Sequence, residues 1–344
     1  MTFSVVIPCR NESAYIENCV QSVVDAIRIS GESGEVIVVD GMSDDGTRSI
    51  LAELNFPELV LVDNQEKTTP QALNLGIRKS SGRIVSILGA HSVVQLDFIS
   101  KNLKALSDFP EAACVGGIII NAYEDSISAS IGKAMSSTFG VGNARFRTGG
   151  EKGYVDTVAF GAYRREVFDR IGLFDATLVR NQDDEFNFRL TEAGMKILYD
   201  PEIVSNYFVR ASFTKLQKQY EQYGYWKVFV NKKFGKITSI RQLAPLGFVL
   251  LLFSVLPVLF LSLFVDNAIV TALFVMALLP IILYMAGMFW FGFKTKPSNL
   301  HEFIRVIYAF WSLHFYYGFG YLKGIIDLVI LSKMPGQKAE SLTR

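Results

Sequence analysis

The first 241 residues alternate short apolar runs with polar turns, a pattern typical of a folded domain with a buried core. Four of these runs are rich in β-branched residues and stop at proline, aspartate or glycine. They predict buried strands at residues 3–8, 35–40, 59–63 and 83–88. Apolar residues at helical spacing predict a helix over 12–29, and a proline near the first turn marks another at 70–79. Strands that alternate with helices imply an α/β fold with a mostly parallel sheet.

Beyond residue 241 the pattern changes, because 245–265 and 268–293 are unbroken apolar stretches. Each is long enough to cross a bilayer core of about 30 Å at about 1.5 Å per residue, and neither has a polar face. A third stretch, 306–321, is rich in aromatic residues and contains His314. Spanning, tilting, re-entering and burial in a protein core all stay open for it.

The segment between these two regions is basic and aromatic. From 210 to 241 it carries eight Lys and Arg residues against one acidic residue, Glu221. Tyr220, Tyr223 and Trp226 recur at helical spacing, which predicts a helix at the membrane interface, attracted to anionic headgroups or a lipid diphosphate. The predicted parts are a folded domain at 1–210, this juxtamembrane segment at 211–241, a membrane region with two to three hydrophobic helices at 242–332, and a polar tail at 333–344.

Flanking charges set the expected orientation. Lysines and arginines precede the first span and follow the second, whereas Asp266 and Asn267 lie in the loop between them. Basic residues mark the cytoplasmic side, so the folded domain is expected to face the cytoplasm from a multi-pass protein of the cytoplasmic (inner) membrane. If the third stretch also crosses, Lys333, Lys338 and Arg344 lie outside, against the rule, so its topology stays open.

Composition removes several classes of protein. Half of the residues are hydrophobic and only 19% are charged, which is more apolar than an ordinary soluble enzyme. A formal net charge of +1 argues against nucleic acid as a partner. Cys9, Cys19 and Cys114 form no CxxC pair, so a disulfide framework or a structural zinc site is not expected. Neither GxGxxG nor GxxxxGK[ST] occurs, which disfavours dinucleotide and P-loop sites.

Candidate chemical groups gather where the predicted strands end, which is where open α/β sheets bind ligands. The first strand runs into Pro8, Arg10 and Glu12, the second ends at Asp40, and His91 follows the fourth. Each has a plainer interpretation. Asp40 can cap the next helix, Glu12 can favour a helix N-terminus, and His91 can be a hydrogen-bonded core histidine.

Several motifs together resemble glycosyltransferase family 2, and most closely its succinoglycan-biosynthesis glucosyltransferase type. The resemblance covers roughly residues 3–230 and implies a GT-A (nucleotide-diphospho-sugar transferase) fold with a mostly parallel mixed sheet, followed by C-terminal transmembrane helices. The motifs are VVIPCRNE (5–12), VVDGMSDDGT (38–47), NLGI (74–77), GAHS (89–92), VDTVAFGAYRREVF (155–168), IGLFD (171–175) and RNQDDEFNFRL (180–190).

The resemblance assigns a nucleotide and a cation to the strand ends. It implies that Pro8, Arg10 and Glu12 surround the base and ribose of the nucleotide, with Asp40 accepting from the base edge. It also implies a divalent cation, Mn²⁺ or Mg²⁺, with His91 as a ligand. In the subgroup the motif before this histidine runs Asp-Ala-His, whereas this chain has Gly89 at the first position.

The last motif carries the chemistry. The family pattern Glu-Asp-x-x-(Leu/Phe)-x-x-Arg, aligned on Phe186 and Arg189, implies that Asp183 is the general base, with Asp184 as the alternative one residue on. On a helix, Asp183 shares a face with Phe186 whereas Asp184 points elsewhere. The plainer interpretation is an acidic first helical turn favoured by the helix dipole.

Three further residues are expected near the donor or acceptor sugar: Asp156, Gly161 and Arg189. Asp156 can equally cap a local turn, and Gly161 can simply form a turn. The family's Gln-x-x-Arg-Trp element is replaced by Gln-Tyr-Gly-Tyr-Trp at 222–226, which disfavours a processive, polymer-extruding enzyme.

The predicted function is an inverting glycosyltransferase. It moves a hexose from a nucleotide diphosphate sugar, by family habit a UDP-sugar, to a lipid-linked oligosaccharide in exopolysaccharide or related surface-glycan biosynthesis. The first alternative is a non-catalytic, membrane-tethered nucleotide-sugar-binding relative, which Gly89 supports. A nucleotidyltransferase is a second alternative, but the glycine-rich loop that such enzymes use for a triphosphate is absent.

Overall fold

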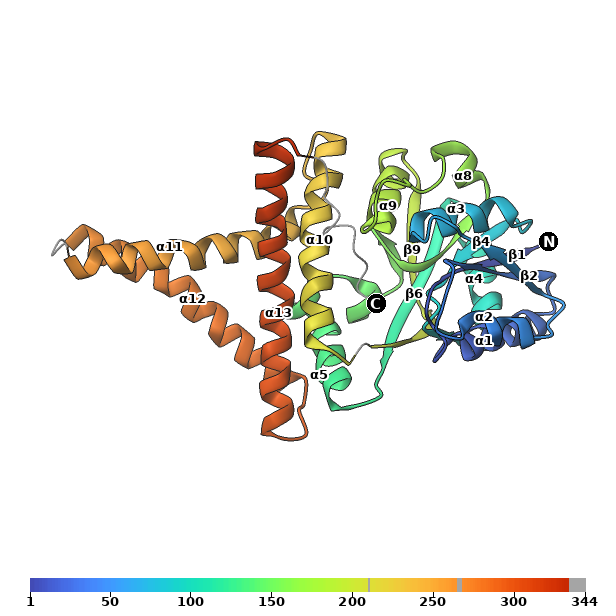
Figure 1. Cartoon of the computed structure of the whole chain (residues 1–344), viewed down its shortest axis with the longest axis horizontal. Helices are drawn as coiled ribbons and strands as arrows, with labels where there is room; N and C mark the ends of the chain where they lie inside the picture. The colour runs from blue at the N-terminus through green and yellow to red at the C-terminus, as the bar shows by residue number, and fades with distance from the viewer. Residues whose placement is uncertain (210, 265–267, 334–344) are drawn as a thin grey trace. The chain divides into compact units, whose positions relative to one another are not determined.

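The computed structural model describes residues 1–209, 211–264 and 268–333, which form two compact units (Figure 1). The first unit comprises residues 1–122 and 143–208, and the second comprises 123–142 and the chain from 209 onward. The predictions that concern Arg210, Val265, the loop with Asp266 and Asn267, and the tail beyond 333 lie outside the described residues.

The first unit is built on a mixed sheet. Within the described residues this sheet has nine strands in the order β3-β2-β1-β4-β8-β6-β9-β5, with β7 paired to β9. The strands are β1 (Phe3–Cys9), β2 (Gly34–Asp40), β3 (Leu59–Asp63), β4 (Ile84–Ile87), β5 (Ser92–Val94), β6 (Ala112–Ala122), β7 (Gly153–Val155), β8 (Ala159–Arg164) and β9 (Lys196–Phe208). The four strands predicted from the sequence are confirmed as β1 to β4, and they pair in parallel.

Helices cover both faces of this sheet, as the alternation of strands and helices predicts. Val5 and Ile7 of β1 pack with α1 and α4 on one face, whereas Val6 packs with α3 on the other. Figure 1 shows α1 and α3 on opposite sides of the strands. The helices of this unit are α1 (Ile16–Ser30), α2 (Thr47–Glu53), α3 (Thr69–Lys79), α4 (Phe98–Asp108), α7 (Arg145–Thr148), α8 (Glu166–Ile171) and α9 (Gln182–Glu192).

The strand directions bring distant parts of the chain to one edge of the sheet. β8 runs antiparallel to both β4 and β6, so β4 and β6 point the same way, and β9 is parallel to β6. The carboxyl ends of β1, β2, β4, β6 and β9 therefore lie together. We call this the carboxyl edge, and the strands end there at Cys9, Asp40, Ile87, Ala122 and Phe208.

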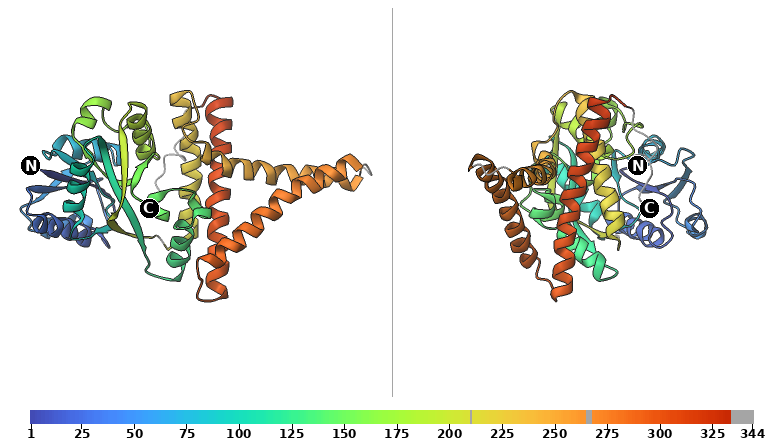
Figure 2. Two further views of the ribbon diagram at one scale, coloured as in Figure 1. Left: turned by 180° about the vertical axis from the view of Figure 1, so that it is seen from behind. Right: turned by 60° about the vertical axis from the view of Figure 1, so that its left-hand side comes forward.

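The second unit is helical. Figures 1 and 2 show α10 and α13 side by side, with α11 and α12 extending from them as a pair. Its elements are α5 (Ser126–Met135), α6 (Thr138–Val141), α10 (Phe213–Phe234), the 3₁₀ turn η1 (Ile240–Leu243), α11 (Ala244–Phe264), α12 (Ala268–Lys294), α13 (Leu300–Gly324) and the π-helical end η2 (Ile325–Ile330).

Glycines bring α10 and α13 into backbone contact. A Cβ on Gly224 would lie 2.0 Å from the carbonyl oxygen of Tyr317, and one on Gly320 would lie 1.9 Å from that of Glu221. Only a residue without a side chain fits such a crossing. Trp226, part of the pattern that predicts an interfacial helix, is buried, so its side chain is enclosed by the protein.

Residues 123–142 belong to the second unit, although in the sequence they lie between the two parts of the first unit. Lys133 of α5 forms an ion pair with Glu302 of α13, with Nζ and Oε1 2.6 Å apart. Phe139 of α6 lies among the rings of Phe291 and Phe310, whose centroids are 5.3 and 5.1 Å from its own. This segment therefore packs on helices that follow it by more than 150 residues in the sequence.

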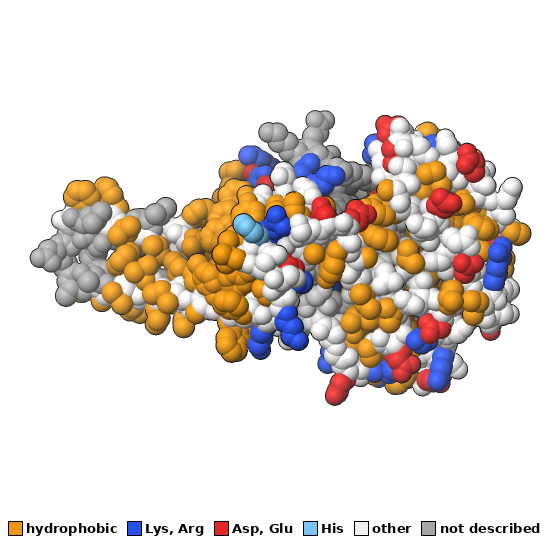
Figure 3. Space-filling view, turned by 90° about the horizontal axis from the view of Figure 1, so that it is seen from below, with side chains coloured by type: hydrophobic (Ala, Val, Ile, Leu, Met, Phe, Trp, Pro, Cys, Tyr) orange, Lys and Arg blue, Asp and Glu red, His pale blue; other side chains and the backbone are white. Residues whose placement is uncertain are grey.

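One of the predicted spans coincides with a long apolar helix. Among the described residues, Phe274–Lys294 of α12 is long and apolar enough to cross a membrane, and only 6% of it is buried inside the protein. A shorter apolar segment, Ile240–Val255, falls where the first span is predicted. Figure 3 shows hydrophobic side chains gathered on the visible face of this unit. A multi-pass arrangement stays a prediction.

Candidate active site

The loops that follow β1 and β2 are tied together at the carboxyl edge. The backbone N–H of Asn11 donates to Ser43 Oγ at 2.8 Å, and that of Glu12 donates to Thr47 Oγ1 at 2.9 Å. Asn11 has a φ of +54°, in the left-handed region, and the chain turns there before α1 begins at Ile16 rather than at Glu12. These bonds fix the backbone on which the predicted nucleotide residues sit.

Asp40 is buried at the end of β2 and is held by its own turn. Its Oδ1 accepts from Ser43 Oγ at 2.5 Å, and its Oδ2 accepts from Arg48 Nη1 at 2.7 Å. Arg48 also donates to Asp63 at the end of β3, at 2.9 Å. The N–H of Ser43 also donates to Asp40 Oδ2, at 3.0 Å, and a carboxylate has about four acceptor sites, so these three bonds leave room for one more donor. Recognition of a base by Asp40 stays a prediction.

Asp45 fastens the same turn. Burial alone raises the pKa of its carboxyl, but hydrogen bonds from the hydroxyl and N–H of Thr47 and from the N–H of Ser13 outweigh this and hold the pKa at about 2. Asp45 is therefore ionised at neutral pH and serves as a fixed anion rather than as a proton carrier.

His91 and Glu12 meet at the carboxyl edge. His91 Nδ1 lies 3.3 Å from Glu12 Oε1, and the two side chains are only 16% and 15% exposed. An ionised carboxylate only accepts, so this pairing favours a proton on Nδ1 and leaves the lone pair on Nε2. Glu12, predicted to contact the nucleotide, thus has a partner within the protein.

Aromatic rings surround His91. Its ring meets that of Tyr207 edge-on, with centroids 4.8 Å apart, and Tyr15 stacks on Phe208 at 5.1 Å. Arg147, from the short helix α7, lies over the Tyr207 ring at 5.7 Å from the centroid. His91 therefore lies among the rings of Tyr15, Tyr207 and Phe208 at the carboxyl edge.

These residues do not by themselves form a cation site. Gly89 replaces the expected aspartate, and a Cβ there would lie 3.2 Å from Cε1 of Phe160, so a phenyl ring occupies that space. No three His, Cys, Asp or Glu side chains within the described ranges converge to hold a metal ion. Mg²⁺ and Mn²⁺ need several oxygen ligands, which His91 with Glu12 does not supply.

Asp183 and Asp184 occupy the first turn of α9. Asp183 is exposed, Asp184 is partly buried, and the N–H of Asp184 donates to Asp183 Oδ1 at 2.9 Å. Burial raises the pKa of Tyr163 in β8, and the nearby Cys114 and Asp183 raise it further. Asp183 therefore interacts electrostatically with a residue of the sheet. The Asp183 side chain is thus solvent-exposed at the start of the helix.

Asn187 fixes which way this turn faces. Its side chain accepts from Tyr163 Oη at 3.1 Å and donates to Thr157 Oγ1 at 2.9 Å. Asp183 lies four residues before Asn187 and shares its face, whereas Asp184 lies about 100° around the helix. Since β8 begins beside Gly89, the loop with Thr157 and the exposed Asp156 lies at the carboxyl edge, and Asp183 faces that loop.

Arg189 is engaged by the protein. It binds both carboxylate oxygens of the buried Glu185, at 2.8 and 3.0 Å, and donates to the carbonyl oxygens of Ile171 and Leu173. Four of its five N–H donors are thereby used. Arg189 fastens the loop after α8, and this role accounts for an arginine here without a sugar contact.

Asn74 holds the same loop from α3. Its side chain donates to the carbonyl oxygen of Phe174 at 2.8 Å and accepts from the Phe174 N–H at 2.9 Å. The NLGI and IGLFD motifs are therefore joined by a buried pair of hydrogen bonds. Both motifs are explained by the fold.

Gly161 lies within β8 and not in a turn. A Cβ there would be 2.8 Å from Cys114 Sγ and 2.9 Å from the Tyr163 ring. Core packing between β8 and β6 thus accounts for the glycine. Contact between Gly161 and a sugar stays an untested prediction.

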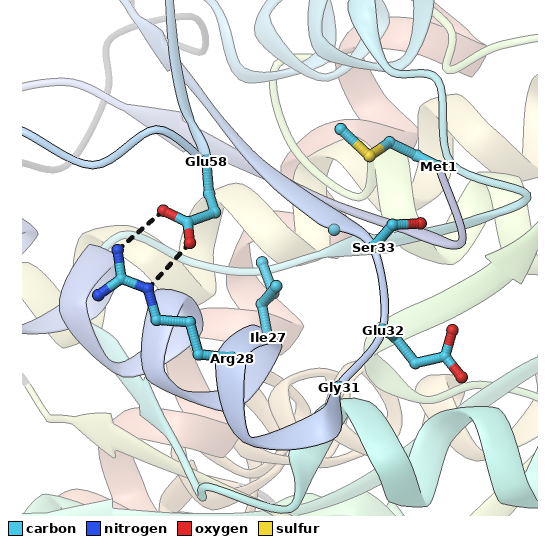
Figure 4. A pocket seen from close by; sticks show the side chains of 8 residues that line it. Met1, Ile27, Arg28, Gly31, Glu32, Ser33 and Glu58 are labelled. Carbon is cyan, nitrogen blue, oxygen red and sulfur yellow. Dashed lines mark hydrogen bonds and ion pairs between the residues drawn. The ribbon is translucent and has the colours of Figure 1, made fainter.

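A surface hollow lies at the opposite edge of the sheet. It has a volume of about 400 Å³ and includes the exposed Arg28–Glu58 ion pair (Figure 4). Met1, Ser33 and Gly34 lie where β1 and β2 begin, so the hollow is remote from the carboxyl edge. None of the predicted site residues lines this hollow.

Sequence reasoning missed Arg48, Tyr207 and Arg147. Arg48 follows directly after the DDGT turn, and Arg147 lies in an RFRT segment that is followed by two glycines. These local signals exist, but Tyr207 reaches His91 only through the pairing of β5 with β9.

Comparison with known proteins gives a consistent set of relatives. The family model described as Glycosyl transferase family 2 matches residues 4–172. The dolichyl N-acetyl-alpha-D-glucosaminyl phosphate 3-beta-D-2,3-diacetamido-2,3-dideoxy-beta-D-glucuronosyltransferase of Methanococcus voltae is 32% identical over 262 residues, which are 74% of this chain and 80% of that protein. Succinoglycan biosynthesis protein ExoA of Rhizobium meliloti is 26% identical over 249 residues, 71% of this chain and 74% of that one. Glycosyltransferase AglE of Haloferax volcanii is 24% identical over 220 residues, 63% of this chain and 70% of that one.

Proposed function

Because the chain belongs to glycosyl transferase family 2, as its motifs predict, we propose that it transfers a hexose with inversion from a UDP-sugar to a lipid-linked oligosaccharide. That the chain is a glycosyltransferase with a GT-A-like α/β fold and a mixed sheet is established by its relatives and its topology. The donor, the acceptor and the stereochemistry are the proposal.

One observation carries it. Asp183 is exposed in the first turn of α9, on the face that Asn187 ties to Thr157 at the carboxyl edge. A carboxylate at a ligand-binding edge, exposed to reactants, suits a general base. Pro8, Arg10 and Asp40 lie at the same edge and support a nucleotide there.

The mechanism follows from this single base. Asp183 takes the proton from the acceptor hydroxyl while that oxygen attacks the anomeric carbon from the face opposite the diphosphate. The bond to the diphosphate oxygen breaks as the new glycosidic bond forms, so a single displacement inverts the configuration. The diphosphate leaves with its electron pair and needs positive charge near it.

A cation is not assigned a step. Family 2 enzymes generally use a divalent cation, but the described donor set, His91 with Glu12, is incomplete without further oxygen ligands. We propose that His91 would hold Mn²⁺ or Mg²⁺ only together with oxygen ligands from the donor, and that the cation would offset the negative charge of the diphosphate.

The acceptor and the membrane belong together in this proposal. The Methanococcus voltae relative is named for a dolichyl-linked acceptor, and the Rhizobium meliloti relative is named for succinoglycan biosynthesis. Phe274–Lys294 supplies one candidate anchor. The names of the relatives support a lipid-linked acceptor in surface-glycan synthesis. The proposal adds a multi-pass anchor with the folded domain on the cytoplasmic side, because basic residues flank the apolar stretches.

The test is product analysis. Membranes that contain the full chain are incubated with a panel of nucleotide sugars and lipid extract, and the anomeric configuration of the lipid-linked product is read by NMR. We expect transfer from one UDP-sugar with inverted configuration. A product that retains the donor configuration contradicts the single-displacement mechanism.

The Phe160 ring beside Gly89 favours a second candidate, a relative that binds donor without turnover. The two candidates differ in one measurement. Slow hydrolysis of the donor by the purified chain, without acceptor, supports the enzyme, whereas donor binding with neither hydrolysis nor transfer supports the binding protein.

A further inference from the structure

Arg147 has a buried donor that the protein does not use. Its Nη1 is inaccessible to solvent and has no hydrogen-bond partner among the residues that the structure describes. The guanidinium carbon lies 5.5 Å from the centroid of the Phe146 ring and 5.7 Å from that of Tyr207. These rings explain the position of the side chain, but a ring face does not satisfy a buried in-plane N–H.

The fold fixes Arg147 at the carboxyl edge. α7 packs on β6 and β9, and Gly149 follows it with a φ of +78°. Arg147 lies over the ring of Tyr207, and His91 meets the same ring edge-on at 4.8 Å. A cationic group and the imidazole thus share one aromatic neighbour.

Arg147 forms no ion pair among the residues that the structure describes, and its charged group contacts the rings of Phe146 and Tyr207. Glu12 faces His91, and Asp40 is bound by Arg48, so neither carboxylate pairs with it. The positive charge of Arg147 is therefore available to a ligand.

The chemistry of the group indicates which ligand. A buried donor without an acceptor is costly, so its retention points to an acceptor that arrives with a substrate. The planar guanidinium matches a phosphate group bidentately, and stacking on an aromatic ring holds its plane. In a glycosyl transfer, negative charge grows on the diphosphate as the anomeric bond breaks.

We propose that Arg147 binds the diphosphate of the nucleotide sugar and stabilises its charge as it leaves. This inference rests on the proposed function and adds a residue that contacts the leaving group. At position 89 this chain has a glycine in place of the aspartate that would help to hold a cation. Arg147 supplies positive charge at the same edge of the sheet.

The test separates diphosphate from nucleoside binding. The affinities of the detergent-solubilised full chain for UDP and UMP are measured by calorimetry in the wild type, Arg147→Gln, Arg147→Lys and Arg28→Gln. Arg28 is the matched control because its ion pair with Glu58 is exposed at the opposite edge of the sheet. For Arg147→Gln we expect UDP affinity to fall about tenfold or more, with UMP affinity unchanged within about twofold.

The other arms give further readouts. Arg147→Lys keeps the positive charge but lacks the planar pair of guanidinium N–H donors, so we expect an intermediate loss of UDP affinity. We expect Arg28→Gln to bind UDP as tightly as the wild type. Equal losses for UDP and UMP would mean a structural role and overturn the inference, as would unchanged UDP affinity.

Two outcomes locate a failure. If the wild type binds UDP and Arg147→Gln binds it equally well, this inference fails and the proposed function stands. If the wild type binds no nucleoside diphosphate in a panel of UDP, GDP and ADP, both fail together.

Discussion

In the body of α9, Glu185 and Arg189 bind each other and the loop after α8, whereas Asp183 in the first turn of the same helix is exposed. One motif thus combines side chains that hold the local structure together with an exposed side chain that we propose to act on the acceptor. From the sequence spacing alone, Arg189 and Asp183 are equally good candidates for residues of the active site. Their hydrogen bonds separate the two roles.

The largest expected effect on stability comes from Arg189→Met. It leaves Glu185 buried without its cation, which costs about 3–5 kcal/mol. Thermal unfolding of the solubilised protein is expected to shift several degrees lower, and activity to fall only as far as the folded fraction falls. An unchanged melting temperature with a raised KM for the donor would return Arg189 to the sugar site.

Gly161→Ala tests the packing explanation for that glycine. The added Cβ meets Cys114 Sγ at 2.8 Å, and overpacking of this kind costs about 1–3 kcal/mol. We expect a lower melting temperature with donor KM unchanged. Gly116→Ala, where the added Cβ would lie 2.7 Å from Val158 Cβ, is a control in the same strands and is expected to behave alike.

A smaller effect is expected at Asp45. Its folded pKa, about 2, lies below the value of about 3.9 for an unfolded chain, so its contribution is present above that value and is lost as pH falls toward 2. Asp45→Ala should therefore lower the melting temperature most above about pH 5, and the difference from wild type should narrow toward about pH 3. A difference that widens on acidification contradicts the depressed pKa.

The smallest effect is expected at Arg48, whose side chain is 42% exposed where it pairs with Asp40. Asp40 is buried, but it keeps two hydrogen bonds from Ser43, and solvent screens the exposed Arg48, so Arg48→Gln is expected to lower the melting temperature only slightly. A large fall in UDP affinity in this variant would show that the Asp40 network also positions the nucleotide.

Local pattern predicted the half of the sheet whose strands follow one another in sequence. β1 to β4 and α1 and α3 were found because their apolar periods and turn residues are local. The antiparallel β8 and the 13-residue β9 were not, since they are defined by pairing with distant strands. Residues 123–142 escaped notice because their packing partners, such as Glu302 and Phe310, lie more than 150 residues further on.

The site divides in the same way. The spacing between Asp183 and Arg189 identifies Asp183 from the sequence, because both residues lie on one helix, which keeps that spacing. Arg147 was not reached, because its approach to Tyr207 depends on α7 packing against β6 and β9. The reason for a glycine at 161 also needed the neighbouring strand.

The central claim is that Asp183 is the base. Its most direct test is the rate of sugar transfer by Asp183→Asn, with Asp184→Asn as the adjacent control, at equal UDP binding. The account predicts a fall of about 10²–10⁴-fold for Asp183→Asn and a far smaller one for Asp184→Asn. Transfer by Asp183→Asn at the wild-type rate would contradict it.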